Sequence, residues 1–134
     1  MILKRIKTAL LLSGYRMNDI IIYHNPRCSK SKATLELITS MGITPIVKLY
    51  LDEPISYDEL SNVLDKLNIS PRELLRKTES LYKKYNLDNN ILDDSEIIKL
   101  MIKNPILIER PIVIRNKRAI IGRPPENVLK IIKK

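Results

Sequence analysis

The chain has very little sulfur and aromatic chemistry available to it. Its 134 residues include one cysteine, Cys28, and one histidine, His24, and they include no phenylalanine and no tryptophan. A single cysteine excludes an internal disulfide, a Cys-x-x-Cys dithiol and a zinc site built from several cysteines. If Cys28 carries out redox chemistry, the second thiol must therefore come from another molecule.

Long apolar runs are also missing, and no stretch is long enough to cross a bilayer as a helix. The formal net charge of +9 is of the kind that favours a nucleic-acid partner. However, the lysines are scattered as on a solvated surface, and only tyrosines are available to stack on bases. We therefore expect a cytoplasmic monomer that binds neither nucleic acid nor a membrane.

Residues 1–16 differ from the rest of the chain. They are basic, contain no acidic residue and carry only a short apolar run, Ala9–Leu12, without a clear cleavage site for a signal peptide. Met17 then precedes a chain that begins like a domain. We expect residues 1–16 to be a poorly ordered N-terminal extension and residues 17–134 to form a single domain.

Hydrophobic spacing predicts a βαβ unit at the start of this domain. Asp19–Tyr23 has the pattern of a buried strand, and a helical pattern runs from about Ser29 to Met41 and ends at Gly42. Pro45–Leu51 has the composition of a second strand. The two strands should be parallel, joined by a right-handed crossover.

A helical insert is predicted for about residues 56–103. One helix begins near Ser56, a short one begins at Ser70-Pro71 and covers Arg72–Lys77, and a third is capped by Asp93-Asp94. The sequence leaves the form of Leu81–Leu87 open.

The α/β pattern resumes near Pro111. Pro111–Ile114 and Ala119–Ile121 predict two strands joined by a turn at Asn116-Lys117, and a final helix follows Gly122–Glu126. The order βαβ, helices, ββα is that of a thioredoxin-like α/β fold with a helical insertion in its middle.

Cys28 lies in the segment His24–Ser31, between the first strand and the first helix. Asn25-Pro26 marks a turn there. A helix N-terminus offers free backbone N–H groups and the positive end of the helix dipole, which favour both a thiolate and a bound anion. Such surroundings can lower the pKa of a cysteine from about 8.5 to roughly 3.5–7.5. This position predicts a nucleophile.

The alternative is an inert cysteine, because a lone cysteine is most often a small buried hydrophobe. Its neighbours Arg27, Lys30 and Lys32 favour the reactive interpretation, since a structural cysteine is seldom surrounded by cations.

Three arginines occupy unusual positions. Arg110 interrupts an apolar run, Arg123 lies in a turn rich in proline, and Arg76 ends the predicted short helix. Taken singly, each fits an exposed or ion-paired arginine, with Glu109 a ready partner. Taken with Cys28, three rigid guanidinium groups predict an oxyanion site, and we expect them to converge beside the sulfur.

These residues carry a resemblance to the glutaredoxin-coupled arsenate reductase family over about residues 20–132. The motifs that match are Ile22-Tyr23-His24-Asn25-Pro26-Arg27-Cys28-Ser29-Lys30-Ser31, Tyr50-Leu51 followed by Pro54, Leu74-Leu75-Arg76-Lys77, Pro105-Ile106-Leu107-Ile108-Glu109-Arg110-Pro111-Ile112-Val113 and Gly122-Arg123-Pro124-Pro125-Glu126.

The resemblance implies a role for each matching residue. Cys28 is similar to the nucleophile that attacks arsenate, and His24 to a histidine that tunes the thiol. Ser31, in place of a second cysteine, could donate a hydrogen bond to the thiolate. The arginines that hold the oxyanion and lower the cysteine pKa correspond to Arg76, Arg110 and Arg123.

The resemblance also implies a cis-proline bond at Arg110-Pro111, and glutathione and glutaredoxin as external reductants, with no bound cofactor and no metal. Two residues depart from the family's pattern. Lys32 stands where the family usually has arginine, and Glu109 places a carboxylate beside Arg110 that could compete with the oxyanion.

Two other functions are compatible with the sequence. Spx-type regulators resemble this family and bind RNA polymerase, but they usually carry a Cys-x-x-Cys pair where this chain has Cys28-x-x-Ser31. The other possibility is a thiol protein that acts on a different oxyanion or on glutathionylated proteins.

Overall fold

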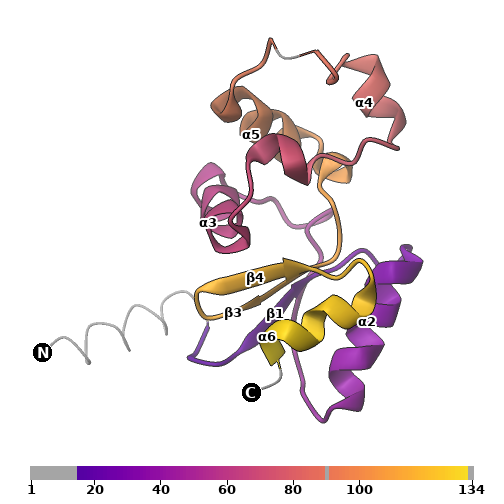
Figure 1. Ribbon diagram of the computed structural model, residues 1–134, viewed down its shortest axis with the longest axis vertical. Coiled ribbons are helices and arrows are strands. Elements are labelled where there is room, and N and C mark those ends of the chain that lie inside the picture. Colours follow the sequence, from indigo (N-terminus) through magenta and orange to yellow (C-terminus); the bar gives the residue numbers. More distant parts are fainter. Residues whose placement is uncertain (1–14, 90, 133–134) are drawn as a thin grey trace, which may run out of the picture.

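The elements follow the predicted order βαβ, helices, ββα (Figure 1). The computed structural model describes residues 15–89 and 91–132, so most of the expected extension, residues 1–16, lies outside the described residues. The elements are β1 (Ile20–Tyr23), α2 (Ser29–Ser40), β2 (Ile46–Lys48), α3 (Tyr57–Leu67), the 3-10 turn η1 (Pro71–Leu74), α4 (Ser80–Lys84), α5 (Asp94–Lys103), the 3-10 turn η2 (Pro105–Leu107), β3 (Ile112–Arg115), β4 (Arg118–Ile121), the 3-10 turn η3 (Pro125–Val128) and α6 (Leu129–Ile132).

The four strands form one sheet in the order β2-β1-β3-β4. β1 runs parallel to β2 and antiparallel to β3, and β3 pairs antiparallel with β4. The two central strands are buried on both faces, which explains why β1 is apolar at every position instead of alternating.

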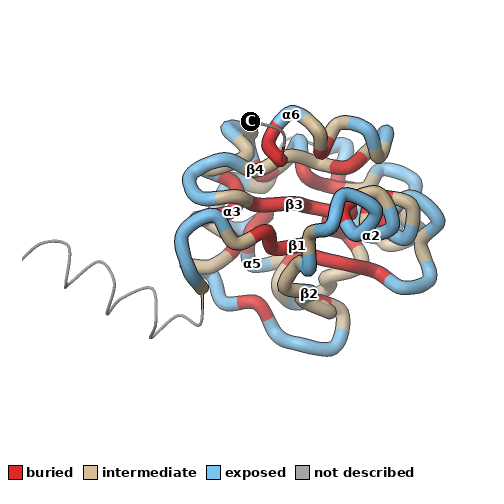
Figure 2. Tube along the Cα trace, turned by 90° about the horizontal axis from the view of Figure 1, so that it is seen from below, coloured by how far each residue is buried: buried red, intermediate tan, exposed pale blue. Residues whose placement is uncertain are grey.

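Helices cover both faces of the sheet, so the core has two parts. Ile20 and Ile22 pack with residues of α2 and α6, whereas Ile21 and Tyr23 point the other way and pack with residues of α3 and α5. This division follows from the alternation of side chains along a strand. Figure 1 shows α2 and α6 on one side of the sheet and α3 on the other, and Figure 2 shows the buried central strands between the layers.

Two predicted helix starts are confirmed by their capping contacts. The Ser56 side chain accepts a hydrogen bond from the Glu59 N–H at 3.1 Å. At the start of α5, Asp93 and Glu96 form a reciprocal capping box. No helix among the described residues is long and apolar enough to cross a membrane.

The predicted helix over Arg72–Lys77 is wrong. Its start is real, because Ser70 and Glu73 form a capping box, but only the 3-10 turn η1 follows. Leu75 is extended and pairs antiparallel with Ile108. A pairing with a distant segment, which buries both side chains, replaces the helix that the local sequence favours.

Two further boundaries differ from the prediction, and the segment whose form was left open contains a short helix. The open segment Leu81–Leu87 contains most of α4, the second strand is only Ile46–Lys48, and the final helix is a 3-10 turn followed by the short α6. Cys28 lies where the sequence predicted it, directly before α2.

Candidate active site

The loop that carries Cys28 is shaped by hydrogen bonds between its own residues. The Cys28 N–H donates to the Asn25 carbonyl at 3.0 Å, and the Arg27 N–H donates to the Asn25 side-chain oxygen at 3.0 Å. An asparagine that bonds to the backbone two residues on is a common way to stabilise a turn. Asn25 therefore sets the turn that leads into α2, as the Asn25-Pro26 pair predicts.

His24 and Ser31 support this loop from inside. The Asn25 N–H donates to Ser31 Oγ at 3.0 Å, and His24 Nδ1 lies 2.6 Å from the same oxygen. All three residues are buried. Burial, helped by the positive charge of Lys32, lowers the pKa of His24, so the ring is neutral near pH 7.

Cys28 is the N-cap residue of α2, which places its sulfur beside the N–H groups of the first helical turn. Partial burial raises the pKa of the thiol, but the Ser31 N–H, the Arg110 guanidinium and the Lys30 N–H outweigh it. The pKa of Cys28 is lowered as a result. The family resemblance suggested that the Ser31 hydroxyl donates a hydrogen bond to the thiolate. In the structure it is the Ser31 backbone N–H that lowers the pKa of Cys28, and Ser31 Oγ accepts a hydrogen bond from the Asn25 N–H.

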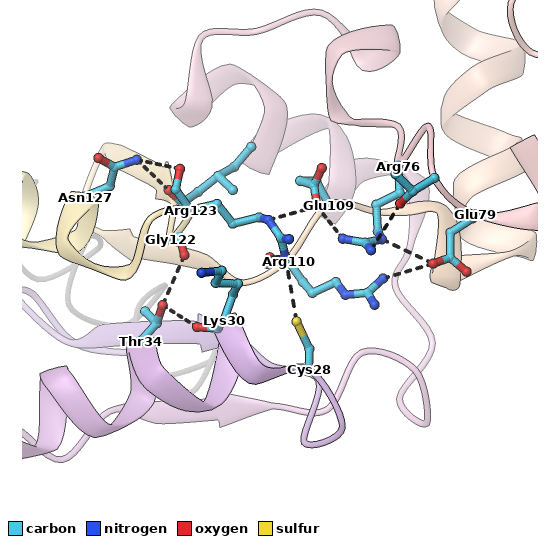
Figure 3. Close-up of polar contacts among 12 residues, drawn as sticks. Cys28, Lys30, Thr34, Arg76, Glu79, Glu109, Arg110, Gly122, Arg123 and Asn127 are labelled. Carbon is cyan, nitrogen blue, oxygen red and sulfur yellow. Dashed lines mark hydrogen bonds and ion pairs between the residues drawn. The ribbon is translucent and has the colours of Figure 1, made fainter.

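Arg123 and Arg110 stand over the sulfur (Figure 3). Arg123 Nη1 lies 3.7 Å from Cys28 Sγ and donates to the Arg110 carbonyl at 3.3 Å. Arg110 is only 9% exposed. The peptide bonds Arg110-Pro111 and Arg123-Pro124 are both cis, so the first agrees with the expectation from the family resemblance.

Arg76 reaches the site through the pairing of two distant segments. The Arg76 N–H donates to the Leu107 carbonyl at 2.8 Å, and the Glu109 N–H donates to the Leu74 carbonyl at 2.9 Å. This short ladder sets Arg76 beside Glu109, and Arg76 Nη1 bonds to Glu109 Oε1 at 2.7 Å.

Two carboxylates join the three arginines into one cluster (Figure 3). Glu109 Oε1 contacts Arg76 and lies 3.7 Å from Arg123 Nε. Glu79 Oε2 lies 3.3 Å from Arg76 Nε and 3.7 Å from Arg110 Nη1. We call these five residues the arginine cluster. The three arginines meet in this cluster, but only Arg110 and Arg123 are placed at the Cys28 sulfur, while Arg76 is joined to them through the two carboxylates.

Glu109 was expected as a ready partner for an arginine, and it pairs with two of them but not with its sequence neighbour Arg110. The Arg110 side chain pairs with Glu79 instead, while Glu109 contacts Arg76 and Arg123. Neighbouring side chains in an extended segment point to opposite sides, which separates Glu109 from Arg110. Glu79 was not among the predicted site residues. It lies three residues after Arg76, and this spacing was the one sign in the sequence that the two side chains could pair.

A close approach at Gly122 brings the Arg123 turn against α2. A Cβ atom on Gly122 would lie 2.6 Å from Thr34 Oγ1 and 2.9 Å from Pro111 Cγ, distances that no side chain tolerates. Thr34 Oγ1 also donates to the Lys30 carbonyl at 2.8 Å. Only glycine lets the turn lie close enough to place Arg123 over the sulfur.

The described part of the chain holds no group of three or more His, Cys, Asp and Glu side chains suited to a metal ion. Its chemistry rests on a thiolate and on cations. A thiolate with a lowered pKa beside guanidinium groups can attack an electrophilic centre whose oxygens carry negative charge.

Comparison with known proteins adds to this picture. The ArsC family model matches residues 23–131. The chain belongs to the ArsC family. It is 49% identical to a protein of Haemophilus influenzae named arsenate reductase, over 85% of this chain and 99% of that protein. It is 44% identical to another so named from Neisseria meningitidis serogroup B, over 84% of this chain and 97% of that one.

A solved structure of the ArsC family confirms the fold. The arsenate reductase from Vibrio cholerae superposes with a TM-score of 0.83 at 44% sequence identity, covering 87% of this chain and 99% of that chain. The thioredoxin-like α/β fold predicted from the order of elements is therefore shown. The segment that matches the family model contains Cys28 and the whole arginine cluster.

Proposed function

We propose that this protein is an arsenate reductase that draws its electrons from glutathione and a glutaredoxin. Relatives named arsenate reductase match it over most of its length. The observation that carries the proposal is the thiol of Cys28, whose pKa is lowered and whose sulfur lies 3.7 Å from Arg123 Nη1. A thiolate under arginines suits an anionic electrophile.

In the first step, arsenate displaces the carboxylates of Glu79 and Glu109 and binds to the three arginines. The Cys28 thiolate attacks arsenic and forms a sulfur–arsenic bond. One arsenic–oxygen bond breaks, and the oxygen leaves as water after taking up a proton. The guanidinium groups stabilise the charge on the remaining oxygens, and those that lie nearest the sulfur belong to Arg110 and Arg123.

In the second step, glutathione supplies the thiol that this chain lacks. A glutathione thiolate attacks the adduct, and two electrons pass to arsenic, which leaves as arsenite. Cys28 is left in a mixed disulfide with glutathione. The thiolate of a glutaredoxin attacks the glutathionyl sulfur and releases the Cys28 thiolate. The cytoplasm, where glutathione keeps thiols reduced, is the compartment that suits this cycle.

The test is arsenate reduction coupled to NADPH oxidation, with glutathione, glutaredoxin and glutathione reductase. We expect turnover from the native protein and none from Cys28→Ser, because the hydroxyl of serine is a far weaker nucleophile than a thiolate. Omitting glutaredoxin should stop turnover while one equivalent of arsenite still forms. Folded native protein without turnover would contradict the proposal and favour another oxyanion as substrate.

A further inference from the structure

Three buried polar atoms in the described chain have no hydrogen-bond partner. They are the hydroxyl oxygen of Tyr50 and two guanidinium nitrogens of Arg110, Nε and Nη1. Arg110 Nη1 has only the long ion pair with Glu79, at 3.7 Å. Buried polar groups without partners are rare and costly, so each needs an explanation, and a catalytic or ligand-binding role is one of them.

These atoms come from the same edge of the sheet. Tyr50 follows the end of β2, and the Cys28 loop follows the end of β1, which is parallel to β2 with Tyr23 opposite Lys48. Arg110 precedes β3, whose first residue Ile112 lies opposite Tyr23 in the antiparallel pair. The ends of β1 and β2 and the start of β3 therefore meet at one edge, and Tyr50 belongs to it.

The charges that act on the Tyr50 hydroxyl are those of the active site. They belong to Arg110, Cys28, Arg76 and Glu109. Tyr50 is 2% exposed. Burial raises its pKa to about 12, so the hydroxyl keeps its proton at neutral pH and is able to donate it in a hydrogen bond.

We propose that Tyr50 is a further substrate-binding residue, whose hydroxyl donates a hydrogen bond to an oxygen of the oxyanion held by the arginine cluster. The inference rests on the proposed function, because it requires the site to bind a tetrahedral oxyanion. The bound anion offers acceptor oxygens to the Tyr50 hydroxyl and to the unpartnered nitrogens of Arg110. It thereby gives all three orphan atoms a partner at once.

A competing explanation is a water in the neighbouring cavity. This cavity has a volume of about 140 Å³ and is lined largely by apolar side chains, among them Ile55, Met101 and Ile102. A buried water needs two to four polar partners, and Asp52 and Tyr50 itself are the only polar side chains of this lining. If a water there does hold the hydroxyl, removing the hydroxyl leaves oxyanion binding unchanged.

The experiment compares Tyr50→Phe with the matched control Tyr82→Phe. Tyr82 is also buried, but its hydroxyl donates to Asp88 at 2.9 Å, outside the active site. Because Cys28 is the only cysteine, alkylation by iodoacetamide reports on this site alone. Phosphate, an unreactive tetrahedral anion, and arsenate are titrated as protectants of the thiol, and arsenate turnover is measured in parallel.

We expect the phosphate and arsenate concentrations that give half-protection to rise about tenfold in Tyr50→Phe and to stay unchanged in Tyr82→Phe. Without anion, the melting temperature of Tyr50→Phe should be unchanged or higher, since an unpartnered hydroxyl has been removed. A half-protection concentration in Tyr50→Phe equal to that of the native protein would overturn the proposal.

The same measurements separate this inference from the reductase proposal. If both anions protect the native protein but it does not turn over arsenate, the reductase proposal is contradicted. The role of Tyr50 is then decided by whether the half-protection concentration rises in Tyr50→Phe. Native protein that neither anion protects overturns the inference as well, because the site then holds no oxyanion.

Discussion

The Cys28 loop, residues 24–31, and the arginine cluster face each other across the site, and different kinds of contact hold them. In the loop, most hydrogen bonds join near neighbours, as His24 to Ser31, and one backbone bond runs from the His24 N–H to the Lys48 carbonyl of β2 at 2.9 Å. In the cluster, side chains from distant segments meet in partly exposed ion pairs, such as Arg76 with Glu109. The Cys28 loop is thus held mainly by local hydrogen bonds, whereas the arginine cluster is held by partly exposed ion pairs, which the proposed substrate would have to replace.

The energies of these contacts support this difference. Partly exposed ion pairs contribute about 0–1 kcal/mol each, and the Glu109 side chain is 26% exposed. A bound dianion offers several charge-assisted hydrogen bonds at once and outcompetes a single carboxylate. The loop is held instead by backbone and side-chain hydrogen bonds around the buried residues His24, Asn25 and Ser31. Four changes test this comparison.

The largest effect is expected for Arg110→Gln. This substitution keeps a polar side chain but removes the buried charge that lowers the pKa of Cys28 and that, under the proposed function, binds the oxyanion. We expect kcat/KM for arsenate to fall by about 100- to 1,000-fold, and the pKa of Cys28 to rise. The coupled assay and the pH dependence of alkylation measure the two effects.

Arg115→Gln is the matched control. Arg115 donates to the Ile131 carbonyl at 3.2 Å, at the opposite end of β3 from Arg110. Its activity should stay near that of the native protein. An equal loss in both variants would mean that general positive charge, and not the position of Arg110, supports the reaction.

Gly122→Ala tests the contact between the Arg123 turn and α2. The added Cβ clashes with Thr34 and Pro111, so the turn must shift. We expect the free energy of unfolding, measured with urea, to fall by about 1–3 kcal/mol. In a double-mutant cycle with Thr34→Ala, part of this loss should be recovered. If the effects of the two substitutions on the free energy of unfolding simply add, the new methyl group does not contact Thr34.

Glu109→Gln and Glu79→Gln test whether the carboxylates compete with the substrate. We expect the arsenate concentration for half-protection of Cys28 to fall by about two- to fivefold in each, since a partly exposed ion pair is lost. Glu59→Gln is the control, because Glu59 pairs with Lys48 outside the cluster. Weaker protection in Glu109→Gln would mean that Glu109 positions Arg76 and does not compete.

The smallest effect is the pH dependence that Cys28 gives to stability. Its pKa is lower in the folded than in the unfolded protein. The thiolate therefore stabilises the fold above the unfolded pKa of about 8.5, and this contribution is lost as the pH falls through the folded pKa. Urea unfolding from pH 5 to 9 should show a rise in stability for the native protein relative to Cys28→Ser. Parallel pH curves would contradict the lowered pKa.

Much of the fold was predictable because its signals are local. The start of α5 is encoded in Asp93 and Glu96, which lie three residues apart, and the turn before Cys28 is encoded in Asn25. The segment after Ser70 shows the limit of such signals. The Ser70-Pro71 pair predicted its start correctly, but the pairing of Leu75 with Ile108, far along the chain, ended it.

The features of the candidate site also divide into those that could be predicted from the sequence and those that could not. The arginines were recognisable from their unusual places and from the family resemblance, but of their two carboxylate partners only Glu109 was. Glu79 carries no motif, and the sequence did not show which of the three arginines Glu109 would face. The orphan hydroxyl of Tyr50 was also invisible, since an unpaired buried group exists only once the surrounding chain has folded.

The sequence by itself determined that a single cysteine begins a helix after a buried strand, because capping, turn and periodicity act over a few residues. It also determined that any redox cycle must borrow a second thiol. Only the tertiary structure decided which carboxylate faces which arginine and where Tyr50 lies. Apart from the pair of Arg76 with Glu79, those contacts join different segments of the chain, and the packing of the insert against the sheet edge brings them together.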